Sequence, residues 1–215
     1  EYKQKRLKAK LKVPEGAPER TLKGSSVNRE LATLKNMFNV ALKQRRLRGE
    51  NPVSPVAFYP EQPRDYVLSH EEVARLLEAA DEKLKKIILI ALNTGLRRGE
   101  ILTLKWSQVN FNDGVISFAR TKSTMFHRVP MNSVVLDVLG SLERKGDYVF
   151  PGRWGRGHIS DCKKPFEVAR EKAGLPELRF HDLRHCAGTY MAMAGVPLTT
   201  VQQILGHRDI KTTTR

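Results

Sequence analysis

The chain has 215 residues and a formal net charge of +15, from 38 Lys and Arg residues against 23 Asp and Glu residues. A hydrophobic content of 40% is enough for a folded core, and the length suggests one or two domains. Two cysteines are too few for a disulfide-rich secreted protein or a cysteine-based zinc finger. No apolar run approaches the ~20 residues of a membrane span, which excludes a membrane protein. We therefore expect a cytoplasmic protein whose partner is a polyanion.

The first 50 residues carry most of the excess positive charge, with 14 Lys and Arg against 5 Glu. Within this segment, apolar residues recur at helical spacing and predict an amphipathic helix over residues 25–47, with Ser25 or Ser26 as its N-cap. Basic side chains lie along this helix and cluster at its end: Lys35, Lys43, Arg45, Arg46 and Arg48. We interpret them as nucleic-acid contacts. The alternatives are a solvated basic tail and, for the arginines, a favourable interaction with the helix dipole.

The following elements are predicted in chain order. Residues 49–65 contain one Gly and four Pro residues, which favours a linker. Ser69 caps a helix over 71–80, and an apolar helix over 84–93 leads through a Gly turn into a short helix over 97–104. Residues 115–119 and 127–131 predict a β-hairpin. The remaining predicted elements are a helix over 134–142, an extended segment over 148–150, and helices over 160–173, 181–194 and 199–205.

Two segments in the middle of the chain place a basic side chain at the edge of an apolar element. After the turn at Gly95, Arg97 stands at a helix N-terminus, where free N–H groups already favour an anion. Glu100, three residues later, is placed to hold the guanidinium; the alternative is a surface ion pair of little energetic weight. Lys122 lies at the tip of the predicted hairpin, where a lysine is most often a solvated turn residue.

Two further segments carry histidines. His181 and Arg184 are three residues apart and share a helix face, which suits a phosphate oxygen. The alternatives are a buried structural histidine and a metal pair of His181 with His185, in which Asp182 stands where zinc-binding helices carry a glutamate. His207 follows Gly206, which ends a helix, and by itself such a histidine is more often structural.

Taken together and in this order, the four segments resemble the tyrosine recombinase, or phage integrase, family. TGLRRGEIL at 94–102 is similar to the family's first arginine motif, HDLRHCAGT at 181–189 to its HxxR motif, and LGH at 205–207 to its third motif. The resemblance implies an α+β fold, with a mostly helical catalytic domain and a small antiparallel sheet, preceded by a helical remnant. Its implied domains are the end of a core-binding domain over 1–52, a Pro-rich linker over 53–65, and a catalytic domain over 66–215 whose C-terminal end is missing.

The resemblance also implies a way of handling the scissile phosphate. Arg97 and Arg184 would clamp it and stabilise its transition state. The family spacing favours Arg97 over Arg98, which is then a DNA contact. Neither a metal nor a cofactor is implied, because a covalent 3′-phosphotyrosyl link conserves the bond energy.

Five other residues receive roles from the resemblance. His181 and His207 would donate hydrogen bonds to the phosphate or move protons, and Lys122 would be the general acid toward the departing 5′ oxygen. Glu100 and Asp182 would orient the catalytic side chains.

The family's nucleophilic tyrosine follows the LGH histidine by nine residues, which corresponds to the position after Arg215. None of the tyrosines in the sequence has this spacing; they are Tyr2, Tyr59, Tyr66, Tyr148 and Tyr190. We therefore expect this chain to bind DNA without cleaving it, and we expect Tyr190 to pack in the core.

The function implied by the resemblance is site-specific DNA strand exchange that integrates or excises a mobile element. The implied partners are double-stranded DNA and further protomers, four in the full-length protein, acting at the nucleoid and not at a membrane. The isolated chain is expected to be monomeric. The alternatives are a type IB topoisomerase-like enzyme, a DNA-binding module without catalysis, and a metal hydrolase built on His181 and His185.

Overall fold

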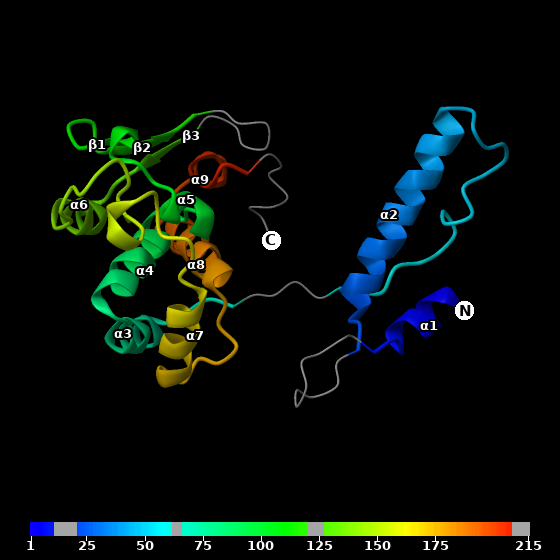
Figure 1. Ribbon diagram of the computed structural model, residues 1–215, viewed down its shortest axis with the longest axis horizontal. Helices are drawn as coiled ribbons and strands as arrows, with labels where there is room; N and C mark the ends of the chain where they lie inside the picture. Colours follow the sequence, from blue (N-terminus) through cyan, green and yellow to red (C-terminus); the bar gives the residue numbers. More distant parts are fainter. Residues whose placement is uncertain (11–20, 62–65, 120–126, 208–215) are drawn as a thin grey trace. The chain divides into compact units, whose positions relative to one another are not determined.

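A computed structural model describes residues 1–10, 21–61, 66–119 and 127–207 (Figure 1). The chain divides into two compact units, Glu1–Arg64 and Asp65–Arg215. The helices described in the first unit are α1 (Tyr2–Leu7) and α2 (Gly24–Lys43). The helices of the second unit are α3 (His70–Ala79), α4 (Glu82–Thr94), α5 (Arg98–Leu102), α6 (Ser133–Gly140), α7 (Lys163–Lys172), α8 (Phe180–Met193) and α9 (Leu198–Leu205), with 3-10 turns η1 (Trp106–Gln108) and η2 (Arg153–Gly155).

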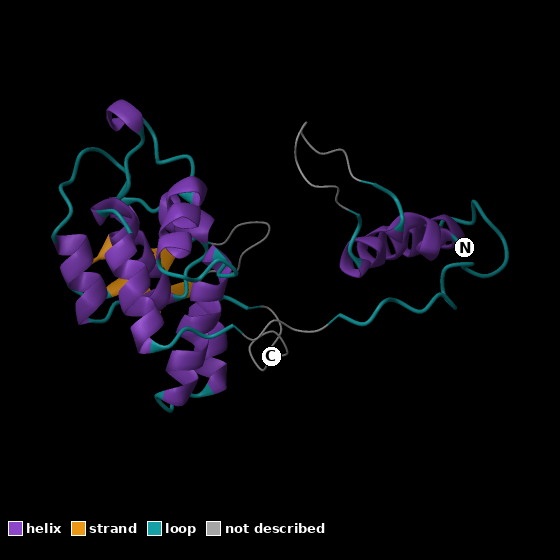
Figure 2. Ribbon diagram, turned by 90° about the horizontal axis from the view of Figure 1, so that it is seen from below, coloured by secondary structure: helices purple, strands orange, loops and turns teal. Residues whose placement is uncertain are grey.

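The second unit has the predicted mostly helical fold with a small antiparallel sheet (Figure 2). Its strands are β1 (Val109–Asn110), β2 (Val115–Phe118) and β3 (His127–Pro130), in the order β1-β2-β3. The β2–β3 pair is the predicted hairpin, with Phe118 opposite His127. Strand β1, which is only two residues long, was not predicted. The predicted extended segment at 148–150 contributes a single bridge, between Lys105 and Tyr148.

Helix α4 forms the centre of the second unit. Its side chains are apolar around most of its circumference, and Ile87, Ile88 and Ile90 are fully buried. The helix packs against α8 and α6, while α9 packs against β3 (Figure 1). None of the described helices combines the length and the apolar character needed to cross a membrane.

Local hydrogen bonds fix where several helices begin and end. The predicted cap of α3 is confirmed: Ser69 Oγ accepts from the Glu72 N–H at 3.2 Å, and Glu72 Oε2 accepts from the Ser69 N–H at 2.8 Å. The predicted serine cap of α2 is wrong, because the helix begins at Gly24 with Lys23 as an N-cap that makes no side-chain bond. That helix also ends earlier than predicted, since Arg45 adopts a left-handed φ of 56°.

Several predicted boundaries also shift in the second unit, among them those of α7 and α5. Helix α7 begins at Lys163 rather than near residue 160, because Asp161 Oδ1 accepts from the backbone N–H groups of Cys162 and Lys163 and starts the helix there. Helix α5 ends at Leu102, two residues before the predicted end.

The described part of the Pro-rich stretch packs onto α2 within the first unit. Val53 is buried beside Val27 and Leu31 of the helix. Asn28 Nδ2 donates to the Tyr59 carbonyl at 2.9 Å, and Asn28 Oδ1 accepts from the Tyr59 N–H at 2.8 Å. These contacts make residues 53–61 part of the first unit rather than a free connection.

Candidate active site

The turn between α4 and α5 is built on Gly95. This residue ends α4 in the left-handed conformation, with φ 66° and ψ 14°. A Cβ atom added here would lie 2.3 Å from Leu205 Cδ2 of α9, so only glycine fits both the backbone and the packing. Thr94 Oγ1 accepts from the Leu96 N–H at 3.2 Å and steadies the turn. The turn thereby fixes the direction in which the next residues leave α4.

Arg97 is the N-cap residue of α5, and Glu100 holds it at two points. Glu100 Oε2 accepts from the Arg97 N–H at 2.8 Å, and Oε1 pairs with the guanidinium Nη1 at 2.8 Å. The Glu100 side chain is 17% exposed and that of Arg97 is 40% exposed. The carboxylate therefore orients a guanidinium that still faces solvent.

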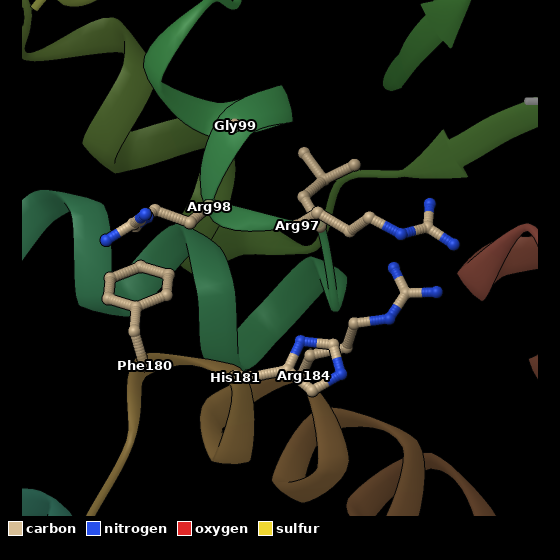
Figure 3. A pocket seen from close by; sticks show the side chains of 7 residues that line it. Arg97, Arg98, Gly99, Phe180, His181 and Arg184 are labelled. Atoms are coloured by element: carbon tan, nitrogen blue, oxygen red, sulfur yellow. The ribbon is translucent and has the colours of Figure 1, made fainter. Parts of the chain in front are cut away.

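Arg97 and Arg98 point in opposite directions (Figure 3). The guanidinium of Arg97 lies beside that of Arg184, whereas Arg98 turns away and pairs with Asp161 at 3.0 Å. Both arginines line one pocket, but the guanidinium of Arg97 is the one that lies beside Arg184.

Arg184 is buried in α8, with 3% exposure, and it joins three parts of the fold. Its Nη1 donates to the Gly95 carbonyl at 2.7 Å, and its Nη2 donates to the Leu205 carbonyl at the end of α9. Burial and the nearby positive charge of Arg97 lower the pKa of Arg184 to about 10, so it stays charged at neutral pH. Two neighbouring cations offset mainly by Glu100 form a natural anion site.

The side chains of Arg97, His181 and Arg184 line one pocket of about 410 Å³. His181 stands in the first turn of α8, at the rim of this pocket (Figure 3). Its imidazole packs edge to face with that of His185, at a centroid distance of 5.0 Å. Although the side chain is exposed, packing on one side of the ring and the neighbouring His185 and Arg184 lower the pKa of His181.

His207 follows the left-handed Gly206 that ends α9, as the sequence predicts. Its N–H donates to the Gln202 carbonyl at 3.0 Å, and its own carbonyl accepts from Gln202 Nε2 at 3.2 Å. Burial, followed by the charges of Arg184 and Arg97, lowers the pKa of His207 to about 4. At neutral pH the imidazole is therefore uncharged and keeps one N–H to donate.

A pH dependence of stability follows from His207. Because its pKa is lower in the folded chain than the ordinary 6.5, the unfolded chain binds the proton more readily. We expect the melting temperature to fall as the pH falls from 6.5 to 4, and to fall less in His207→Gln. Calorimetry across this range measures both, and His158→Gln, which removes an exposed imidazole outside the pocket, is the control. Equal falls in His207→Gln and the parent chain would contradict the expectation.

The remaining predicted site residues lie in different surroundings. Asp182 is buried, and its Oδ2 accepts from the Arg179 N–H at 2.8 Å, which stabilises the start of α8. Lys122 lies outside the described residues. Within the described ranges, no group of three or more potential metal ligands gathers around His181 and His185.

Four of the five predicted DNA contacts of the first unit gather at the end of α2, and Lys35 lies in its middle. Lys35 is half-buried, and its carbonyl accepts from Asn51 Nδ2 at 2.9 Å. The other four side chains are exposed: Lys43, Arg45, Arg46 and Arg48.

Sequence reasoning missed His127, which packs against the turn that carries His207. Its ring is buried and stacks on Phe118 at a centroid distance of 4.9 Å. A Cβ atom on Gly206 would lie 3.4 Å from His127 Nδ1. Side chains in the predicted strand alternate between the core and solvent, and His127 occupies a core position that apolar residues usually fill. This alternation could have indicated that His127 is buried.

Comparison with known proteins places the chain among integrases. The model of the phage integrase family matches residues 66–215. The integrase of Escherichia phage P2 is 32% identical over 197 residues, covering 89% of this chain and 55% of that protein. The chain thus spans little more than half the length of this relative.

Two solved structures share the fold. The catalytic domain of bacteriophage HP1 integrase is 32% identical, with a TM-score of 0.55 over 69% of this chain and 84% of that one. The Tn1549 transposon integrase, in complex with a circular intermediate DNA, has a TM-score of 0.74 at 22% identity, over 89% of this chain and 74% of that one. Because the family model matches more than half of its residues, the chain belongs to the phage integrase family.

Proposed function

We propose that this chain carries the phosphate-binding residues of a site-specific recombinase that integrates or excises a mobile element. The observation that carries the proposal is the placement of Arg97 and Arg184 side by side at one pocket, with His181 at its rim. Two guanidinium groups with five N–H donors each suit the non-bridging oxygens of a phosphodiester. Relatives named integrases and the DNA in the Tn1549 integrase structure support this substrate.

In the proposed reaction a tyrosine hydroxyl attacks the phosphorus of the scissile phosphate and passes its proton to a neutral imidazole of the site. The P–O5′ bond breaks, a 3′-phosphotyrosyl bond forms, and the 5′ oxygen takes a proton from Lys122. Arg97 and Arg184 stabilise the charge that develops on the phosphate, and the neutral His181 and His207 donate hydrogen bonds to it. Glu100 and Asp182 act as positioning residues for Arg97 and for the first turn of α8.

We assign the two units to different tasks. The first unit is the end of a core-binding domain whose exposed basic side chains contact the DNA backbone, and residues 66–215 belong to the catalytic domain. The partners are double-stranded DNA of the nucleoid and further protomers, four in the full-length protein. No metal or cofactor takes part in the proposed chemistry.

Covalent trapping tests the proposed chemistry. The 215-residue chain should bind a nicked duplex without forming an adduct, because none of its tyrosines stands nine residues after His207. Tyr190, for example, donates its hydroxyl to the Leu68 carbonyl at 2.5 Å. A chain that continues past Arg215 with a tyrosine at the next position should form a denaturation-resistant adduct. An adduct with residues 1–215 alone, or none with the longer chain, would contradict the proposal.

A type IB topoisomerase-like activity is the second candidate, because the same phosphate site would serve it. Strand exchange between two duplexes supports the recombinase, whereas relaxation of supercoiled DNA without exchange would favour the topoisomerase.

Affinity for duplex DNA is expected to fall steeply with salt. Counterion release at six or more phosphate contacts would weaken binding by about 10³-fold between 50 and 200 mM salt. Replacing the exposed Arg46 with Gln should lower the slope of log affinity against log salt by about 1. Lys145→Gln is the matched control, since Lys145 pairs with Glu143 at 2.8 Å and should leave the slope unchanged. A salt-independent affinity would count against a phosphate-binding surface.

A further inference from the structure

An exposed tryptophan stands at the tip of the loop between Pro151 and His158. The side chain of Trp154 is 89% exposed, the highest value among the large hydrophobic residues that the structure describes. Its φ is 63°, a left-handed conformation that is unusual for a bulky residue. An indole that a strained backbone exposes to solvent is a candidate binding group, because strained residues often lie at ligand-binding sites.

The loop that presents this indole is closed by its own backbone. Pro151 and His158 form an antiparallel bridge, and the Gly152 N–H donates to the Gly157 carbonyl at 3.2 Å. A Cβ atom on Gly152 would lie 2.6 Å from the Arg156 carbonyl oxygen, so the two sides of the loop approach as closely as glycine allows. Trp154 therefore lies on a turn that its own backbone hydrogen bonds hold in shape.

Two arginines flank the indole. Arg153 and Arg156 are both exposed, and within the described ranges neither guanidinium lies within 4 Å of a carboxylate. The chain then runs from this loop to Asp161, which pairs with Arg98 at the edge of the phosphate pocket. Along the chain, the loop therefore comes shortly before the aspartate that pairs with Arg98, a residue lining the pocket in which the scissile phosphate is proposed to bind.

We propose that the loop of Arg153, Trp154 and Arg156 binds the duplex whose scissile phosphate occupies the pocket. The indole lies against sugars and bases, and the two guanidinium groups bind neighbouring phosphates. This proposal rests on the proposed function. Duplex DNA fits better than a second copy of the chain, since a partner must neutralise two cations that pair with none of the described carboxylates, and a copy with a net charge of +15 brings no excess negative charge to do so.

Tryptophan fluorescence tests the contact directly, because the sequence holds two tryptophans, Trp106 and Trp154. Trp106 packs against Phe111 and beneath the Arg144 guanidinium, so Trp106→Phe leaves Trp154 as the sole emitter with an aromatic ring still in place. Acrylamide should quench Trp154 strongly in the free protein. Saturating duplex DNA, monitored by the anisotropy of a dye on the DNA, should reduce this quenching severalfold.

Substitutions at Trp154 measure the contribution of the contact. Trp154→Ala should weaken duplex binding by about 10-fold, within the range for one aromatic–base stack. Trp154→Gly should weaken it equally, because glycine suits the left-handed backbone and keeps the loop's shape. Met193→Ala is the control, since Met193 is also exposed, at 79%, and should leave the affinity unchanged.

The outcomes separate this proposal from the proposed function. Duplex binding without protection of Trp154, or unchanged affinity in Trp154→Gly, overturns the loop contact and leaves the recombinase assignment standing. Protection that appears with protein concentration in the absence of DNA assigns the loop to a protein interface and overturns the contact. Failure to bind any duplex overturns both.

Discussion

Arg97→Ala is expected to slow DNA cleavage by about 10³-fold, whereas Arg98→Ala should slow it less than about 10-fold. The reason is geometric: Arg97 lies beside Arg184 at the pocket, and Arg98 turns away to Asp161 (Figure 3). A donor aimed at developing charge is worth far more than a surface ion pair. The measurement is the rate of covalent adduct formation on a nicked duplex, in a chain that carries the expected tyrosine.

Arg97→Lys is the informative control for this pair. It keeps the positive charge but loses the planar fork that binds both Glu100 and an anion, so its rate should lie between those of Arg97→Ala and the parent. Melting temperatures of all three variants separate loss of chemistry from loss of fold. A larger defect in Arg98→Ala than in Arg97→Ala would reassign the catalytic arginine.

Gly95→Ala is expected to destabilise the second unit by about 3 kcal/mol. A non-glycine residue at φ 66° costs roughly 1–2 kcal/mol, and the new methyl group would meet Leu205 Cδ2 at 2.3 Å, which adds the cost of overpacking. The expected fall in melting temperature is about 10 °C. Phosphate binding should weaken as well, because the Gly95 and Leu205 carbonyls are the two acceptors that position Arg184.

Gly174→Ala separates the two causes. Gly174 also has a left-handed φ, 72°, but nothing lies within 4 Å of its missing Cβ atom. It should therefore cost only the backbone strain. Leu205→Ala combined with Gly95→Ala should cost less than the sum of the two single changes, because the first removes the atom with which the new methyl group clashes. Equal destabilisation in the two single glycine variants would show that Leu205 moves aside freely.

Local signals in the sequence predicted the elements that depend on local interactions. The cap at Ser69, the hairpin of β2 and β3, and the Gly95 turn each depend on neighbours within a few residues. The end of α2 was not predictable in this way, because Arg45 takes a conformation usually reserved for glycine.

The site was predicted less completely than the fold. The pairing of Arg97 with Glu100 follows from a spacing of three residues and was expected. The burial of Arg184 was not, since its two carbonyl acceptors come from distant turns that only the tertiary fold brings together. The Arg98–Asp161 pair and the contact of His127 with Gly206 were not predicted either, because these residues are also far apart in the sequence.

The two carbonyl bonds of Arg184 make anion binding conditional on the docking of α9. A guanidinium has five N–H donors, and the bonds to Gly95 and Leu205 leave three to face a phosphate. If α9 undocks, Arg184 loses one of its two anchors, and the turn that carries His207 leaves with the helix. Local unfolding of a single eight-residue helix would therefore weaken the proposed phosphate site at Arg184 and His207 while Arg97 stays held by Glu100.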